Sequence, residues 1–180
     1  AHNLGLLVQV GTNGILLPEG FERKSSVDRF VLPIDGATPG IHNSVRLWRS
    51  QHHSVIMDCL AKLAAVKKST TVSTVVTKKN RNHLRQIGSL LKELDRNSAF
   101  LHAWHLYLFI PEGRGGAIHK EELLLSKAEY NEAVSTIEDL DLGFQVFRRP
   151  DMMRSKTVEF FWMEKGQVIG QLGLQRRYLR

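Results

Sequence analysis

Cysteine is almost absent from this sequence of 180 residues, which contains a single one, Cys59. One thiol excludes an internal disulfide framework and a cysteine-rich metal site. Cys59 lies in the apolar, helix-like stretch VIMDCLAKLAAV, where we expect it to pack as a small hydrophobic side chain. So little cysteine suits a reducing compartment, and we therefore predict a cytoplasmic protein.

Several other features are missing, and each absence argues against a class of protein. No apolar run approaches the ~20 residues that a membrane-spanning helix needs, so we expect no membrane partner. The N-terminus carries no secretory signal pattern. Neither a phosphate loop ending in Gly-Lys-Ser/Thr nor a Gly-x-Ser-x-Gly nucleophile elbow occurs.

Acidic residues are outnumbered by basic ones, with 18 Asp and Glu against 25 Lys and Arg, a net charge of +7 and a pI near 9.8. This balance favours an anionic partner. The most basic stretch, TKKNRNHLR at residues 77–85, contains none of the aromatic side chains on which the bases of single strands stack. A nucleic-acid partner is therefore the less favoured alternative, and we expect a small-molecule substrate, with an anionic one favoured.

The sequence does contain a regular alternation of strand-like and helix-like segments. Runs of β-branched and aromatic residues predict strands, and amphipathic runs predict helices. The predicted strands are residues 6–10, 29–34, 70–77, 103–110, 143–149 and 157–164, and the predicted helices are residues 43–66, 84–94 and 126–140. We expect the first helix to break near SQHHS, with His52 and His53 solvated at the break. The order is typical of a parallel α/β sheet or barrel.

Small and polar residues follow the first four predicted strands. They are Gly11–Gly14, Asp35-Gly36, Thr77–Asn80 and Pro111–Arg114. Ligands of parallel α/β folds bind at the carboxyl ends of the strands, which lie together at one edge of the sheet. We therefore expect the binding site to be built from these four stretches.

Four segments, VGTNGILL, VLPIDGATPGIHNSVR, VSTVVTKKNRNHL and WHLYLFIPEGRGG, occur in this order. Together they resemble the second half of the barrel of radical S-adenosylmethionine (SAM) enzymes, over roughly residues 5–116. The resemblance implies an α/β fold, a partial (β/α)6 TIM-like barrel that lacks the first two β-α units. It places this partial barrel in residues 1–120 and a C-terminal helix and strands, which complete or cap it, in residues 121–180.

The resemblance also implies a chemistry. The full-length parent would hold SAM and a [4Fe–4S] cluster, cleave SAM reductively to a 5′-deoxyadenosyl radical and abstract a hydrogen from a small-molecule or peptide substrate. The Cys-x-x-x-Cys-x-x-Cys loop and the Gly-Gly-Glu motif of the family are absent here, and one cysteine cannot hold the cluster. We expect this chain to supply contacts to SAM and substrate and to be inactive alone; no metal ligand, no catalytic residue and no firmly held cofactor is assigned to it.

The positions that the resemblance assigns to SAM lie at or after the carboxyl ends of predicted strands: Thr12, Asn13, Asp35, Arg46, Val76, Asn80, Ile110 and Pro111. Arg46 matches a helix arginine that pairs with the SAM carboxylate, a role that suits the fork of a guanidinium. Arg114 is assigned to the substrate. One position departs from the family: Pro33 stands two residues before the aspartate, where a serine is common, and it offers neither a hydroxyl nor a backbone N–H.

Two alternative functions stay open, and the missing units also predict an assembly state. The chain could be a degenerate, non-catalytic barrel that acts as a binding or assembly module, or a basic nucleic-acid binder. Without the first two units, residues 6–10 would form an edge strand with unpaired backbone groups. We therefore expect a homo-oligomer that forms through this edge.

Overall fold

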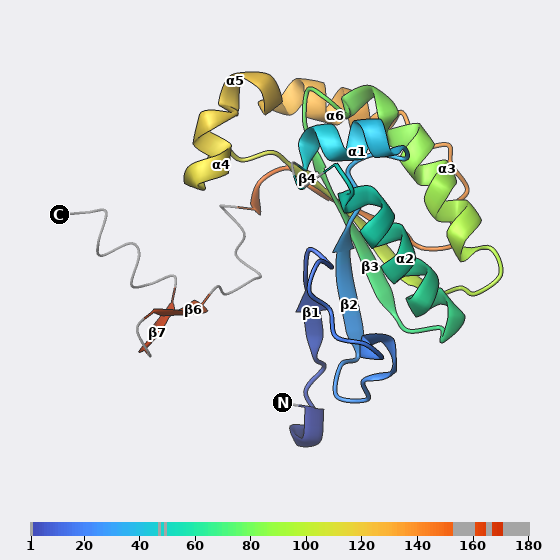
Figure 1. Cartoon of the computed structure of the whole chain (residues 1–180). Coiled ribbons are helices and arrows are strands. Elements are labelled where there is room, and N and C mark those ends of the chain that lie inside the picture. The colour runs from blue at the N-terminus through green and yellow to red at the C-terminus, as the bar shows by residue number, and fades with distance from the viewer. Residues whose placement is uncertain (1, 47, 49, 153–160, 165–166, 171–180) are drawn as a thin grey trace. The chain divides into compact units, whose positions relative to one another are not determined.

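The structure is a computed structural model that describes residues 2–46, 48, 50–152, 161–164 and 167–170 (Figure 1). The chain divides into two compact units, residues 1–150 and residues 151–180. The first unit contains the sheet, all of the helices described below and the candidate site. The predicted division into a partial barrel over residues 1–120 and a C-terminal part over residues 121–180 stays a prediction.

The first unit is built on a five-stranded parallel sheet in which each strand lies beside the next one along the chain. Its strands are β1 (Gln9–Gly11), β2 (Arg29–Pro33), β3 (Thr70–Val76), β4 (Leu101–Leu108) and β5 (Gln145–Arg149). The strand order β1-β2-β3-β4-β5 confirms the predicted α/β fold. It also brings the carboxyl ends of neighbouring strands to one edge of the sheet.

The four larger helices cover one face of the sheet (Figure 1). They are α1 (Pro39–Val45), α2 (His52–Ala65), α3 (Leu84–Asp95) and α6 (Lys127–Ser135), and the shorter helices are α4 (Gly113–Ile118), α5 (Lys120–Leu123) and the 3-10 turns η1 (His2–Leu4), η2 (Phe21–Arg23) and η3 (Arg81–His83). The helical region predicted over residues 43–66 is two helices, as the predicted break near SQHHS requires, and the first of them begins earlier, at Pro39. The predicted helix over residues 126–140 begins with a capping box between Ser126 and Glu129 and ends earlier, at Ser135.

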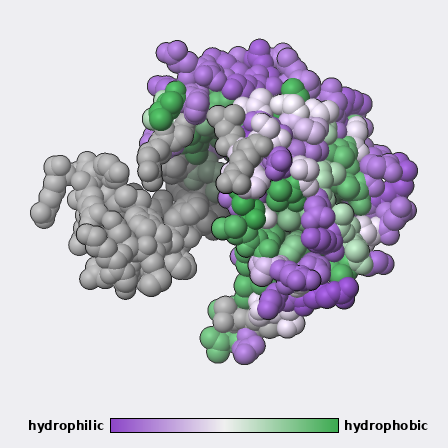
Figure 2. All heavy atoms as spheres, viewed as in Figure 1, coloured by the Kyte–Doolittle hydropathy of each residue, from purple (hydrophilic) through white to green (hydrophobic). Residues whose placement is uncertain are grey.

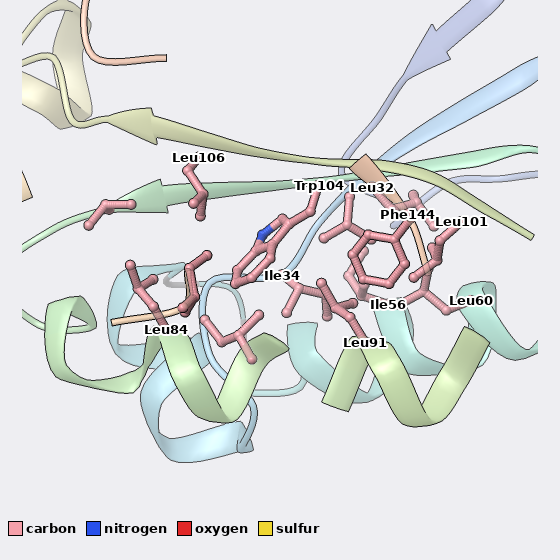
Figure 3. Close-up of a cluster of buried hydrophobic side chains, with 14 of the residues drawn as sticks. Leu32, Ile34, Ile56, Leu60, Leu84, Leu91, Leu101, Trp104, Leu106 and Phe144 are labelled. Atoms are coloured by element: carbon pink, nitrogen blue, oxygen red, sulfur yellow. The ribbon is translucent and has the colours of Figure 1, made fainter. Parts of the chain in front are cut away.

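The hydrophobic core lies between the sheet and these helices (Figure 3). Leu32 of β2 and Leu106 of β4 meet Leu60 of α2 and Leu84 of α3 there, and all four are fully buried. Trp104 fills the centre, and its indole Nε1 donates a hydrogen bond of 2.8 Å to Thr74 Oγ1. Because strand side chains alternate in direction, the residues between these positions face the other side of the sheet.

The edge strand β1 is shorter than predicted and pairs only with β2 in the described part of the chain. Leu4, Leu6 and Leu7, just before it, are all exposed. Figure 2 shows hydrophobic residues along the side of the molecule where β1 and β2 lie, and hydrophilic residues over α5 and α6. Association of two copies through this edge stays a prediction.

The second unit contains an antiparallel hairpin of β6 (Phe161–Glu164) and β7 (Gln167–Gly170). Residues 157–160 of the strand predicted at 157–164 lie outside the described residues. No helix in the described ranges is both long and apolar enough to cross a membrane.

Candidate functional site

A pocket of about 370 Å³ opens at the carboxyl ends of β2, β3 and β4. Asp35 and Val75 line it from the ends of β2 and β3, and Tyr107 and Ile110 line it from β4 and the segment that follows. Arg46, directly after α1, completes this side of the pocket. The volume lies within the range of small-molecule sites. Three of the residues assigned to SAM, Asp35, Arg46 and Ile110, therefore meet in one cavity.

Asp35 is fully buried and orients Arg46. Its Oδ1 accepts a hydrogen bond of 2.7 Å from the Val75 N–H, and its Oδ2 accepts a hydrogen bond from Arg46 Nε. Burial raises the pKa of Asp35, while Arg46 and the Val75 N–H act in the opposite direction. The Arg46 side chain is 32% exposed, so one side of the guanidinium is held by Asp35 while the group still reaches the pocket.

Two buried histidines connect the end of β2 to the loop after β1. The Asp35 N–H donates to His42 Nδ1 at 3.1 Å, His42 Nε2 lies 2.8 Å from His52 Nδ1, and His52 Nε2 lies 2.8 Å from the Asn13 carbonyl oxygen. A backbone donor at one end and a carbonyl acceptor at the other define the proton positions. Each ring is neutral, accepts at Nδ1 and donates from Nε2. Burial and the neighbouring His52, His53 and Arg46 lower the pKa of His42 to about 3.

This arrangement corrects the prediction of a solvated helix break at His52 and His53. The two residues form the first turn of α2, and they are 2% and 8% exposed. The chain does break between α1 and α2, but the break brings the start of α2 against the strand ends instead of into solvent. Sequence reasoning missed the pairing because His52 lies 10 and 39 positions from its partners His42 and Asn13.

Asn80 is buried outside the pocket lining, and its side chain connects the ends of β2 and β3 by hydrogen bonds. Its Nδ2 donates to the carbonyl oxygens of Asp35 and Val75, both at 2.9 Å, and its Oδ1 accepts from the Thr77 N–H at 2.8 Å. Asn80 therefore fixes the backbone that carries Asp35. Val76 lies in the core on the helix side of the sheet, and its neighbour Val75 lines the pocket in its place.

Of the remaining assigned residues, Thr12, Asn13 and Pro111 lie in loops after strands, and Arg114 lies in a helix. Thr12 and Asn13 stabilise their own turn, since Thr12 Oγ1 accepts from the Gly14 N–H at 3.1 Å and Asn13 Oδ1 from the Ile15 N–H at 3.2 Å. Pro111 lies beside the pocket residue Gly116. Arg114 falls in α4, and its side chain is outside the described part of the structure.

Two glycines allow close approaches of backbone at this site. A Cβ on Gly36 would lie 2.4 Å from the His42 nitrogen and 2.8 Å from the Ile41 carbonyl carbon, so a side chain there would push α1 off the end of β2. A Cβ on Gly116 would lie 3.0 Å from the Pro111 carbonyl carbon. Both glycines therefore keep the walls of the site in place.

The described residues contain no cluster of three or more histidine, cysteine, aspartate or glutamate side chains that could hold a metal ion. Cys59 is buried in α2, and burial raises the pKa of its thiol. These groups do not fit a [4Fe–4S] cluster, which is held by several thiolates. The pocket does fit parts of SAM, because Arg46 suits a carboxylate and Val75 and Ile110 offer apolar contact to a base.

No family model matches the sequence, and no curated protein matches it. Solved structures do match. A domain of pyruvate-formate lyase-activating enzyme from Bacteroides vulgatus aligns with a TM-score of 0.59 at 9% identity, over 83% of this chain and 84% of that one. Streptococcus suis SuiB aligns with a TM-score of 0.60 at 14% identity, and SuiB bound to S-adenosylmethionine with a TM-score of 0.62 at 13% identity. This chain spans about a third of the SuiB chain.

At these identities the matches show a shared fold. The chain has an α/β fold whose five-stranded parallel sheet, alternating with helices, matches the partial TIM-like barrels of radical SAM proteins. The resemblance stated from the strand-end motifs is thus confirmed at the level of the fold.

Proposed function

We propose that the pocket at the ends of β2, β3 and β4 binds SAM, and that the chain is part of a radical SAM enzyme. The observation that supports this most directly is Arg46, which is held at the pocket by the buried carboxylate of Asp35. A cation oriented in this way is suited to grip a carboxylate group of a ligand. One structural neighbour, SuiB, has S-adenosylmethionine bound.

The rest of the pocket suits the other parts of SAM. The Val75 side chain and the Ile110 segment offer apolar surface for an adenine ring, and Tyr107 extends the lining along β4. The buried network of Asp35, His42 and Asn80 keeps the strand ends rigid. We propose that Thr12, Asn13 and Pro111 act through the backbone they position, and that Val76 acts by packing in the core.

The chemistry of a radical SAM enzyme also needs an iron–sulfur cluster, which reduces bound SAM so that a radical can abstract hydrogen from the substrate. The described residues do not fit that cluster. We therefore propose that this chain contributes the SAM and substrate contacts, and that cysteines outside it hold the cluster in the active enzyme.

A second candidate is a degenerate barrel that acts as a binding or assembly module. Two observations favour it: Pro33 is buried in β2 where the family commonly has serine, and the leucines before β1 are exposed along the sheet edge. Such a protein would associate through β1 without binding SAM. Titration of the chain with SAM, described next, distinguishes the two candidates.

The experiment is calorimetric titration of the purified chain with SAM and with methylthioadenosine, which lacks the amino-acid carboxylate. We expect Arg46→Gln to weaken SAM binding about tenfold or more, since a charge-assisted hydrogen bond is lost. Methylthioadenosine binding should change less than twofold. Arg23→Gln, which removes only an exposed contact to Glu22, is the control. Equal loss for both ligands, or no SAM binding by the unmodified chain, would refute the proposal.

A further inference from the structure

The two adjacent arginines at the end of β5 lie on opposite faces of the sheet. Arg148 pairs with Glu138, which follows α6 on the helix side. Arg149 lies on the other face, with its guanidinium carbon 5.0 Å from the centre of the Phe147 ring. Among the described residues, no carboxylate lies within ion-pair distance of Arg149. In that described part of the chain, this arginine is thus a cation positioned by an aromatic ring and without a carboxylate partner.

A histidine and a tyrosine of β4 lie directly beside this arginine. The strand register pairs His105 with Phe147 and Tyr107 with Arg149. The His105 and Phe147 rings meet edge to face at 5.0 Å, and His105 Nδ1 lies 3.1 Å from the Tyr107 hydroxyl. Tyr107 also lines the candidate SAM pocket, so the cluster of His105, Tyr107, Phe147 and Arg149 adjoins that pocket.

The cluster presents hydrogen-bond donors and a positive charge. Burial, Arg149, His102 and Arg29 lower the pKa of His105 to about 4, so its imidazole is neutral at pH 7. A neutral imidazole bonded to a tyrosine leaves one donor unused in either tautomer, the Tyr107 O–H or the His105 Nε2–H. Arg29, the other arginine that lowers the His105 pKa, donates a hydrogen bond from its Nε to the neutral Ser69 hydroxyl.

We infer that the cluster of His105, Tyr107, Phe147 and Arg149 binds an oxyanion of the substrate, a phosphate or a carboxylate, beside the SAM pocket. The inference rests on the proposed function, because it treats the adjoining pocket as the cofactor site. A guanidinium stacked on a ring keeps its N–H edge available and pre-oriented, which suits the two oxygens of such a group. The unused donor on β4 would supply a third contact.

Arginine at this position also gives the site its selectivity. Among the described residues, Arg149 and Arg29 both place positive charge near His105, so an anionic group is attracted and a cationic one repelled. The sequence-based expectation of an anionic substrate rested on the total charge and on three arginines near predicted strand ends or turns, Arg114, Arg148 and Arg149. The present inference assigns the anion to one place, the cluster on β4 and β5.

The test measures binding of pyrophosphate and of malonate to the 15N-labelled 180-residue chain by amide chemical shifts. Arg149→Gln is compared with Arg148→Gln, which alters the next residue of the same strand and removes the same charge from the opposite face. We expect Arg149→Gln to weaken binding of at least one anion tenfold or more and Arg148→Gln to change it less than twofold. Preference for pyrophosphate would assign a phosphate group, and preference for malonate a carboxylate.

Two results would overturn the inference: no saturable binding of either anion, or equal weakening by the two variants, which would indicate attraction by net charge alone. Arg149→Lys guards against misfolding, because it retains the charge while losing the fork, and it should give an intermediate affinity. SAM binding is measured on the same samples. Anion binding without SAM binding would refute only the proposed function, and SAM binding without an Arg149 effect would refute only this inference.

Discussion

Both carboxylate oxygens of Asp35 are engaged by neighbours, one by the Val75 N–H and the other by Arg46. Asp35 therefore acts by positioning Arg46 and the end of β3. Its importance could be predicted from the sequence because an aspartate directly follows a strand. Its contact with Arg46 could not, since that contact depends on how α1 folds back over the strand end. Alternation along β3 shows that Val75 and Val76 face opposite sides, but only the packed core shows which one faces the pocket.

The buried histidine chain makes stability depend on pH. Unfolded His42 titrates near 6.5 and folded His42 near 3. Between these values the unfolded chain binds more protons, so stability falls as the pH is lowered, by about 1.4 kcal/mol for each unit below 6.5. We expect His42→Gln to remove the His42 contribution, so that the slope becomes shallower, while lowering stability at pH 7; His105, whose pKa is also lowered, keeps a slope of its own. Urea unfolding from pH 7 to pH 4.5 measures the slope, and an unchanged slope in the variant would contradict the assignment of neutral rings.

At the scale of elements, local patterns in the sequence predict the order of strands and helices. They do not predict the contacts between residues of different elements. The β-branched run of β3, the amphipathic α3 and the capping box of α6 are all legible in short windows. The prediction that His52 and His53 are solvated was wrong. Two adjacent histidines indicate an exposed, polar segment unless their hydrogen-bond partners are known. His42 and the Asn13 carbonyl, the partners of His52, and the Asn43 side chain, which accepts from the His53 N–H, come from other elements.

The turn between β2 and α1 has no room for one added methyl group at Gly36, so we expect an alanine there to lower the stability of the protein. Gly36→Ala places a Cβ against backbone atoms of Ile41 and His42, and we expect a loss of at least about 3 kcal/mol, typical of severe overpacking. Gly40→Ala, in α1 with open space around its Cβ position, is the matched control and should be neutral or stabilising by up to about 1 kcal/mol. Thermal and urea unfolding measure both. Equal effects would show that the contact at Gly36 can relax.

For the whole molecule, the sheet has an open edge at β1 and exposed leucines beside it in the described part of the chain. Edges of this kind pair with other strands unless they are covered or charged. The proposed enzyme and the proposed assembly module would both cover this edge, the first with further strands and the second with another copy. The overall fold was predictable from sequence; what covers the edge depends on partners that the chain alone does not specify.

We predict that the purified chain self-associates through β1 at micromolar concentration. Leu6→Glu with Leu7→Glu should shift the population to monomer, because two charges would be buried at the pairing edge. Ile118→Glu, an exposed apolar residue of α4, is the control and should leave the assembly intact. Size-exclusion chromatography with light scattering reports the masses. A monomeric unmodified chain would contradict the prediction.

The most direct test of the central claim is to map SAM onto the 15N-labelled chain by amide chemical shifts. The account predicts saturable shifts concentrated at the ends of β2, β3 and β4, in particular at Asp35, Val75 and Ile110. Arg46→Gln should reduce them at the same SAM concentration. An absence of shifts, or shifts confined to β1 and the residues before it, would contradict the assignment of this pocket to SAM.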